Sequence, residues 1–133
     1  GLDRLSTWDV VVKTCNETSS GTDASVFLKV YYIHANAHEI FQLDHPTRND
    51  FERGARDHFK IFLNSSDITH IGLFWWPTLS LSQSWCVDWL TIMNSESEEC
   101  FVAVFSKWIL HYSDPPTYPS SFAKTRFAHC VSP

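Results

Sequence analysis

Oxygen-bearing side chains gather in two short polar stretches of the sequence. Asp23 follows a Ser-Ser-Gly turn, and Asn49, Asp50 and Glu52 stand together in a second turn-rich stretch. Carboxylate and amide oxygens on loops suit Ca²⁺, which takes about 6–8 oxygen ligands in flexible geometry. The structural alternative is that Asp side chains cap turns by accepting hydrogen bonds from their own backbone. The residue types predict a calcium site if the fold brings the two stretches together.

A run of large apolar residues marks a second candidate site. Trp75, Trp76, Leu79 and Leu81 lie in the segment that joins two predicted strands. Exposed apolar patches often mark contacts with membranes or proteins, and tryptophan favours the membrane interface. Alternatively, Trp75 ends the preceding strand in the core and Trp76 packs beneath the loop, because large aromatic side chains are usually mostly buried. The run predicts a surface that binds lipid or a partner protein.

Patterns typical of catalysis are weak. His34 and His38 have metal-ligand spacing only on a helix, and Asn36 between them indicates a turn. No G-x-S-x-G nucleophile elbow occurs, and the Asp44-His45 pair has no evident nucleophile. The sequence therefore predicts a binding module rather than an enzyme, with no catalytic residues.

Composition narrows the class of partner. The chain has 133 residues, of which 44% are hydrophobic, and this suits one globular domain over residues 1–133. Its net charge is -5, whereas nucleic-acid binding needs a basic stripe and adhesion to anionic lipid needs Lys/Arg clusters. No apolar stretch is long enough to span a membrane. The composition predicts no nucleic-acid partner and no transmembrane segment.

Alternation of apolar and polar residues is the dominant pattern, and it predicts β-strands separated by turn residues. Eight short strands without a long helical pattern predict an all-β sandwich or barrel. The predicted strands cover Trp8–Lys13, Val26–Tyr32, Ile40–Leu43, Phe59–Leu63, Ile68–Phe74, Trp85–Met93, Phe101–Phe105 and Phe122–Val131. The tryptophans predicted to lie in the core are Trp8, Trp85, Trp89 and Trp108.

Strand direction then decides which loops meet. If successive strands alternate in direction, the first, third, fifth and seventh connections share one end of the sandwich. This arrangement brings the two acidic stretches and the tryptophan run to the same pole. It also places Cys15 and Cys86 at that pole, and Cys100 and Cys130 at the far end, which predicts these two pairs among the three connectivities that four cysteines allow.

The cysteines and two sequons predict the compartment. Four cysteines without a C-x-x-C pair suit two disulfides in an oxidising compartment rather than a zinc ribbon. The sequons Asn16-Glu17-Thr18 and Asn64-Ser65-Ser66 predict glycosylation at Asn16 and Asn64. We therefore expect a secreted protein.

Five local patterns together resemble a known family. The two more specific ones are GTDASVFL at 21–28 and NDFERGARDHF at 49–59. The three weaker ones are ITHIGL at 68–73, WCVDWL at 85–90 and KWI at 107–109. In this order and spacing they resemble the PLAT (polycystin–lipoxygenase–alpha-toxin, or lipoxygenase homology) family, from about Trp8 to Leu110. Residues 111–133 match poorly.

The resemblance implies a fold and a site. It implies two packed four-stranded antiparallel sheets, in a domain that guides a neighbouring domain to lipid or to a partner protein. The calcium ligands that it implies are Gly21, Thr22, Asp23, Asn49, Asp50 and Glu52. The chain departs from this pattern at Ser82-Gln83-Ser84, where the calcium-binding members of the family have acidic residues.

Two functions are consistent with these features. The first is a secreted module that binds lipid surfaces or apolar ligands through its tip loops, with Ca²⁺ assistance. The second is an extracellular module that binds another protein. The family resemblance favours lipid, whereas the predicted glycan on Asn16 and the incomplete calcium pattern favour a protein partner.

Overall fold

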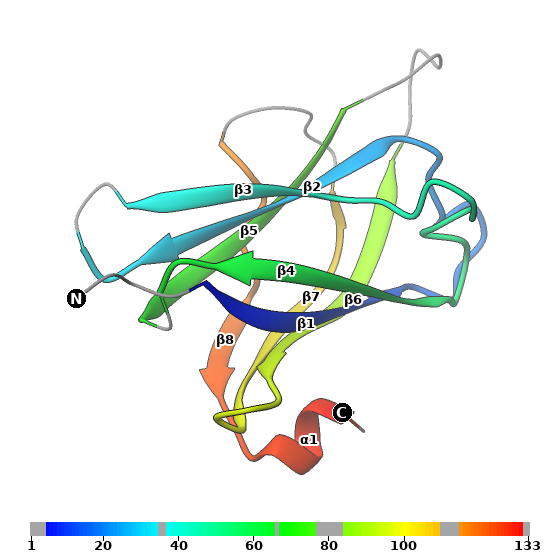
Figure 1. Cartoon of the computed structure of the whole chain (residues 1–133). Coiled ribbons are helices and arrows are strands. Elements are labelled where there is room, and N and C mark those ends of the chain that lie inside the picture. Colours follow the sequence, from blue (N-terminus) through cyan, green and yellow to red (C-terminus); the bar gives the residue numbers. More distant parts are fainter. Residues whose placement is uncertain (1–4, 35–36, 66, 77–83, 110–114, 132–133) are drawn as a thin grey trace.

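A computed structural model describes residues 5–34, 37–65, 67–76, 84–109 and 115–131 of the chain. These residues form eight β-strands and one short helix, arranged around two antiparallel sheets (Figure 1). The elements are β1 (Ser6–Thr14), β2 (Ser25–Tyr32), β3 (His38–Leu43), β4 (Arg56–Leu63), β5 (Ile68–Trp76), β6 (Trp85–Asn94), β7 (Glu99–Ile109), β8 (Ser121–Lys124) and α1 (Phe127–Val131).

The strands divide into a five-stranded sheet, in the order β4-β1-β6-β7-β8, and a three-stranded sheet, in the order β3-β2-β5. Figure 1 shows the three-stranded sheet as the upper layer and the five-stranded sheet below it. Every second residue of β2 from Val26 to Tyr32 is buried, and so is every second residue of β4 from Asp57 to Leu63. This is the period of strands that turn one face to a core, and it confirms the predicted all-β fold.

The predicted division into two four-stranded sheets is wrong, and the last strand explains why. The chain first meets the three-stranded sheet, where Thr117 and Leu73 of β5 exchange backbone hydrogen bonds of 2.8 and 2.9 Å. Pro119 lacks the amide hydrogen that continued pairing there would need. The chain then crosses to the other layer, where Ser121–Lys124 pairs with β7. The last strand therefore belongs to the five-stranded sheet.

The predicted strand Phe122–Val131 is also shorter than expected. β8 stops at Lys124, and the Thr125 amide donates a hydrogen bond of 2.8 Å to the carbonyl oxygen of Cys100 near the beginning of β7. Because β7 offers almost no further backbone to pair with, the chain turns into α1, which carries Cys130. In the described residues, no helix has the length and apolar character needed to cross a membrane.

The four tryptophans predicted to lie in the core divide into two groups. Trp8 and Trp85 are fully buried, as predicted. Trp89 and Trp108 are only half-buried, so their assignment to the core is wrong. The pairing of β6 with β7 is irregular just before Trp89, and a bulge moves the following side chains to the opposite face of a sheet. The Trp89 ring consequently lies outside, with the Arg56 guanidinium 5.3 Å from its centre.

Two disulfides fasten the sandwich. Cys15 at the end of β1 is bonded to Cys86 in β6, with 5.3 Å between their Cα atoms. Cys100 in β7 is bonded to Cys130 in α1, with 6.1 Å between their Cα atoms. The pairing agrees with the argument from strand direction, although Cys130 lies on a helix rather than at the end of a strand.

Replacing both Cys15 and Cys86 by alanine should lower the free energy of unfolding by about 2–4 kcal/mol. The bond joins residues 71 positions apart and so restricts the unfolded chain strongly. Urea denaturation measures the loss. The Cys100→Ala, Cys130→Ala variant, which opens a link of only 30 positions, is the comparison and should lose less. A larger loss in the second variant would contradict this account.

Candidate functional site

The loop after β1 and the loop after β3 meet at one end of the sandwich. We call this end the loop pole and define it by residues 15–24 and 44–55. The Gly54 amide of the second loop donates a hydrogen bond of 3.0 Å to the carbonyl oxygen of Cys15 in the first. Figure 1 shows the two loops together at the right of the molecule. The two acidic stretches of the sequence therefore lie side by side.

Phe51 joins the two loops to each other and to the core. Its amide donates to the Asp57 carboxylate at 2.9 Å, and its carbonyl oxygen accepts from the Thr22 amide at 3.0 Å. Its ring packs edge-on against Trp85 and stacks on Phe59, with centroid distances of 5.0 and 5.5 Å. Its φ of 61° is left-handed, which is rare for a bulky residue and persists only where the surroundings fix it. Phe51 thus fixes the geometry of the loop pole.

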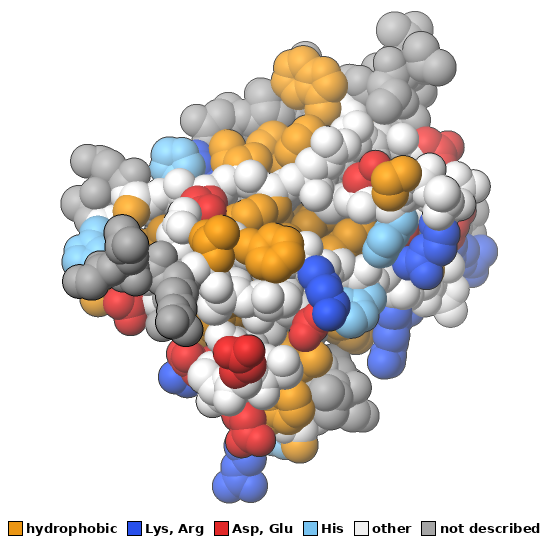
Figure 2. All heavy atoms as spheres, viewed as in Figure 1, with side chains coloured by type: hydrophobic (Ala, Val, Ile, Leu, Met, Phe, Trp, Pro, Cys, Tyr) orange, Lys and Arg blue, Asp and Glu red, His pale blue; other side chains and the backbone are white. Residues whose placement is uncertain are grey.

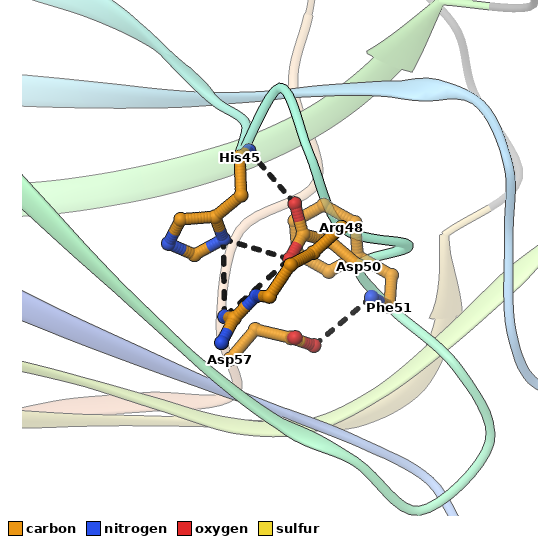
Figure 3. A network of polar contacts seen from close by, with 5 residues as sticks. All are labelled: His45, Arg48, Asp50, Phe51 and Asp57. Carbon is orange, nitrogen blue, oxygen red and sulfur yellow. Dashed lines mark hydrogen bonds and ion pairs between the residues drawn. The ribbon is translucent and has the colours of Figure 1, made fainter.

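The carboxylate of Asp50 is engaged by its own loop. Asp50 Oδ2 accepts the backbone N–H of His45 at 2.9 Å, and Oδ1 lies 2.7 Å from Nδ1 of the same histidine. An Arg48 guanidinium nitrogen lies 3.8 Å from Oδ1. Figure 3 shows the Asp50 carboxylate directed at these two residues. Since the side chain is only 5% exposed, Asp50 acts as the cap of this turn.

The other predicted calcium ligands are spread over two recesses of the loop pole. Asn49 and Asp50 line one recess, Gly21 and Glu52 line the other, and Thr22 and Asp23 border both. A Cβ atom on Gly21 would lie 2.8 Å from the Phe51 carbonyl oxygen, so glycine is required there by backbone packing. Within the described ranges, no three His, Cys, Asp or Glu side chains are grouped so that they could hold a metal ion.

These side chains do not fit a calcium ion in their present arrangement. Calcium requires about 6–8 oxygen ligands, but the Asp50 oxygens already serve His45 and Arg48. On the other side of the pole, Ser84 rather than an acidic residue borders the recess beside Glu52. Asp50 closes its own turn, and backbone hydrogen bonds from Thr22 to Phe51 and from Gly54 to Cys15 hold the two loops together.

The two tryptophans at the end of β5 have different environments. Trp75 is 4% exposed, and its Nε1 donates a hydrogen bond of 2.6 Å to the carbonyl oxygen of Ile109. Its inclusion in the predicted binding surface is therefore wrong, because it shares the inward direction of Leu73. Trp76 points outward and is 51% exposed. The remaining predicted contact residues, Leu79 and Leu81, lie outside the described residues.

Sequence reasoning missed an aromatic surface on the outer side of the three-stranded sheet. Phe27 of β2 stacks on Phe74 of β5 at 5.1 Å, and Tyr31 stacks on His70 at 4.0 Å. The available signal was apolar residues at both odd and even positions of β2 and β5. A strand with one solvated face normally carries polar residues at alternate positions.

Both sequon asparagines are exposed. Asn16 lies in the loop pole, and its Oδ1 accepts a hydrogen bond of 3.2 Å from Arg53 Nε. Asn64 follows β4 at the opposite end of the sandwich, where its backbone N–H donates a hydrogen bond of 3.1 Å to the Glu39 carboxylate. Glycosylation at these positions remains a prediction that their exposure permits.

Comparison with known proteins relates the chain to one domain family. The family model of the PLAT/LH2 domain matches residues 8–122. The human lipoxygenase homology domain-containing protein 1 is 28% identical over 95% of this chain, which spans only 6% of that protein. The structure of coral 8R-lipoxygenase, whose description reports calcium activation via a C2-like domain, matches with a TM-score of 0.69 and 22% identity over 79% of this chain and 16% of the enzyme. The alpha toxin of Clostridium absonum matches with a TM-score of 0.65 and 18% identity over 93% of this chain and 32% of the toxin.

Substitution of Asp50 by alanine should destabilise the fold by about 1–3 kcal/mol, because the His45 amide loses its acceptor. Asp23→Ala removes an exposed carboxylate of the same pole and should change stability by less than about 0.5 kcal/mol. Urea denaturation of both variants measures the difference. Equal losses would show that Asp50 is not the cap of its loop.

Asp57 should make stability depend on pH. Burial raises the pKa of this carboxyl above 3.8, and the nearby Asp50 charge adds to the effect. The folded chain therefore holds the proton more tightly than the unfolded chain, so this contribution to stability is complete below pH 3.8 and is lost as pH rises through the raised pKa. In Asp57→Asn, which keeps an acceptor for the Phe51 amide, the stability lost between acidic and neutral pH should be smaller than in the wild type. A larger loss of stability in Asp57→Asn than in the wild type would show that Asp57 is not the source of this pH dependence.

Proposed function

Because this chain belongs to the PLAT/LH2 domain family, we propose that it is a non-catalytic binding module that attaches to lipid surfaces or apolar ligands through its loop pole and the adjacent end of β5, which carries Trp76. The chain spans only 6% of the human relative and 16% of the coral enzyme. The proposal therefore concerns the surface of this domain and not the activities of those larger proteins.

The observation that carries the proposal is the exposure of Trp76. This indole ends β5, where the chain leaves the three-stranded sheet, and about half of its surface meets water. Its neighbour Trp75 is anchored in the core by the hydrogen bond to Ile109, which holds the end of the strand in place. Tryptophan favours the boundary between water and hydrocarbon, because its apolar ring carries a polar N–H. A rigidly mounted, exposed indole suits contact with a lipid surface.

In this proposal the contact is apolar and does not use calcium. The carboxylate best placed within the β3–β4 loop, that of Asp50, is buried and engaged by His45. A cation bridge to phosphate headgroups would need those oxygens to turn outward, at the cost of the cap. The predicted calcium assistance is therefore left out of the proposed mechanism.

An extracellular location is part of the proposal. Two disulfides are typical of an oxidising compartment, and both sequon asparagines are exposed. Passage through an oxidising secretory compartment accounts for both features.

A second candidate function is the binding of an extracellular protein. The observation that favours it is the position of Asn16 in the loop pole, beside Arg53. A glycan there would hold a flat bilayer away from the pole, whereas a protein partner could fit around it. Binding to vesicles by the glycosylated protein would argue against this candidate.

Trp76→Ala should weaken binding to phosphatidylcholine vesicles about tenfold. Burial of a large apolar side chain contributes about 1.5–3 kcal/mol, and each 1.4 kcal/mol corresponds to a factor of ten. Vesicle sedimentation measures the effect. Phe62→Ala, which removes a comparably exposed ring from β4, is the matched control and should bind like the wild type.

The same assay is run with calcium and with chelator, and the two should agree. Absence of vesicle binding in both conditions would sink the lipid proposal. Binding only with calcium would show that the loop pole rearranges around a cation and would overturn the apolar mechanism.

A further inference from the structure

The outer side of the three-stranded sheet is an exposed aromatic surface. We call it the aromatic face and define it by Phe27, Tyr31, Ile40, His70, Phe74 and Trp76. The alternate residues of the same strands point inward and form the core, so these six turn away from it. Figure 2 shows hydrophobic side chains projecting along the upper edge of the molecule, which is the outer side of this layer.

Strand register places the rings of the aromatic face in two stacked pairs. In the pairing of β2 with β5, Phe27 lies opposite Phe74 and Tyr31 lies opposite His70. The first pair stacks with 12° between the ring planes, and the second with 9°. Trp76 continues the row toward the loop pole. The two ring pairs lie on one side of the sheet, with Lys29 opposite Gly72 between them and Pro116 packed against Gly72. Trp76 stands at the end of the Phe27–Phe74 pair and carries the proposed function.

The aromatic face is partly open to water. Phe27, Tyr31 and Phe74 are half-buried, whereas His70 is exposed. Ile40, on the edge strand β3, is 50% exposed, and Trp76 is 51% exposed. An isolated exposed apolar residue needs no explanation, but a contiguous patch marks a contact surface.

The distribution of carboxylates identifies the kind of surface that fits. The chain has 15 acidic residues and a net charge of -5. The outer side of the five-stranded sheet carries Asp9 and Asp88, yet none of the described side chains that point outward from β2, β3 and β5 is an Asp or a Glu. An acidic protein that keeps carboxylates off one aromatic face can bring that face to an anionic surface with the least repulsion.

We propose that the aromatic face lies flat against the interfacial region of a lipid bilayer, with Trp76 at one end of the contact. The inference rests on the proposed function and extends it from the loop pole to the whole three-stranded sheet. Tyrosine and tryptophan are suited to this region, because each has an apolar ring and a polar group.

The test places a negative charge on the aromatic face. Ile40→Glu and the nearly isosteric Gln42→Glu change exposed residues of edge strand β3. Phe62→Glu makes the same kind of change on edge strand β4, where Phe62 is 55% exposed on the other sheet. Sedimentation with vesicles of phosphatidylcholine and phosphatidylserine gives the dissociation constants, and thermal unfolding verifies that each variant is folded.

Both β3 variants should bind about fivefold more weakly than the wild type, since a charge near an anionic lipid surface is worth about 1 kcal/mol. Phe62→Glu should bind like the wild type. If both β3 variants bind normally while Trp76→Ala is impaired, the contact is confined to the pole and the inference is wrong. Equal weakening by Phe62→Glu would also overturn it, because the effect would then be general repulsion. If Trp76→Ala and both β3 variants all bind normally, the proposed function itself is wrong.

Discussion

The shape of this domain at its loop pole depends above all on one residue, Phe51. Its ring is part of the core, its carbonyl oxygen holds the β1–β2 loop through Thr22, and its amide holds the Asp57 carboxylate. These contacts overcome the cost of a left-handed backbone at a bulky residue. The polar residues around it, including Asp50 and His45, complete the closure of the turn. At the loop pole, the buried carboxylates of Asp50 and Asp57 therefore have a structural task, because each accepts a backbone hydrogen bond.

The predicted site had two parts, the acidic residues of the loops and the apolar run that contains Trp76, and the structure gives them different roles. Of the carboxylates that look like metal ligands in the sequence, Asp50 is drawn into the turn, whereas Asp23 and Glu52 stay exposed. In the described part of the predicted apolar surface, Trp76 is the exposed group. The exposed indole joins a row of rings on the outer side of β2 and β5. The outer side of the three-stranded sheet thus combines aromatic side chains with an absence of carboxylates on its described strands, whereas the outer side of the other sheet carries Asp9 and Asp88 beside exposed apolar residues such as Phe62. This is why we propose that the domain attaches through apolar side chains and not through a bound cation.

Much of the fold could be predicted from the sequence, because strand period and strand direction are local properties. They identify the strands, bring the acidic loops to one pole and pair the cysteines correctly. They fail where one residue changes the facing of a strand, as at the irregularity before Trp89, and where the chain leaves one sheet for the other, as between Thr117 and Ser121. The role of Asp50 was also hidden, since its partners are backbone and side-chain groups within one turn. The two-residue period of a strand could have assigned Trp75 to the core, because it lies two positions after the buried Leu73 and points to the same side.

The most direct test of apolar attachment is quenching of tryptophan fluorescence by phosphatidylcholine brominated along its acyl chains, measured in chelator. Trp8 and Trp85 are fully buried and serve as internal references. We predict that these vesicles quench the emission of the wild-type protein and that most of the quenching disappears in Trp76→Phe. Emission that is unaffected by brominated lipid, although the protein binds the vesicles, would show that Trp76 does not enter the bilayer and would contradict the account.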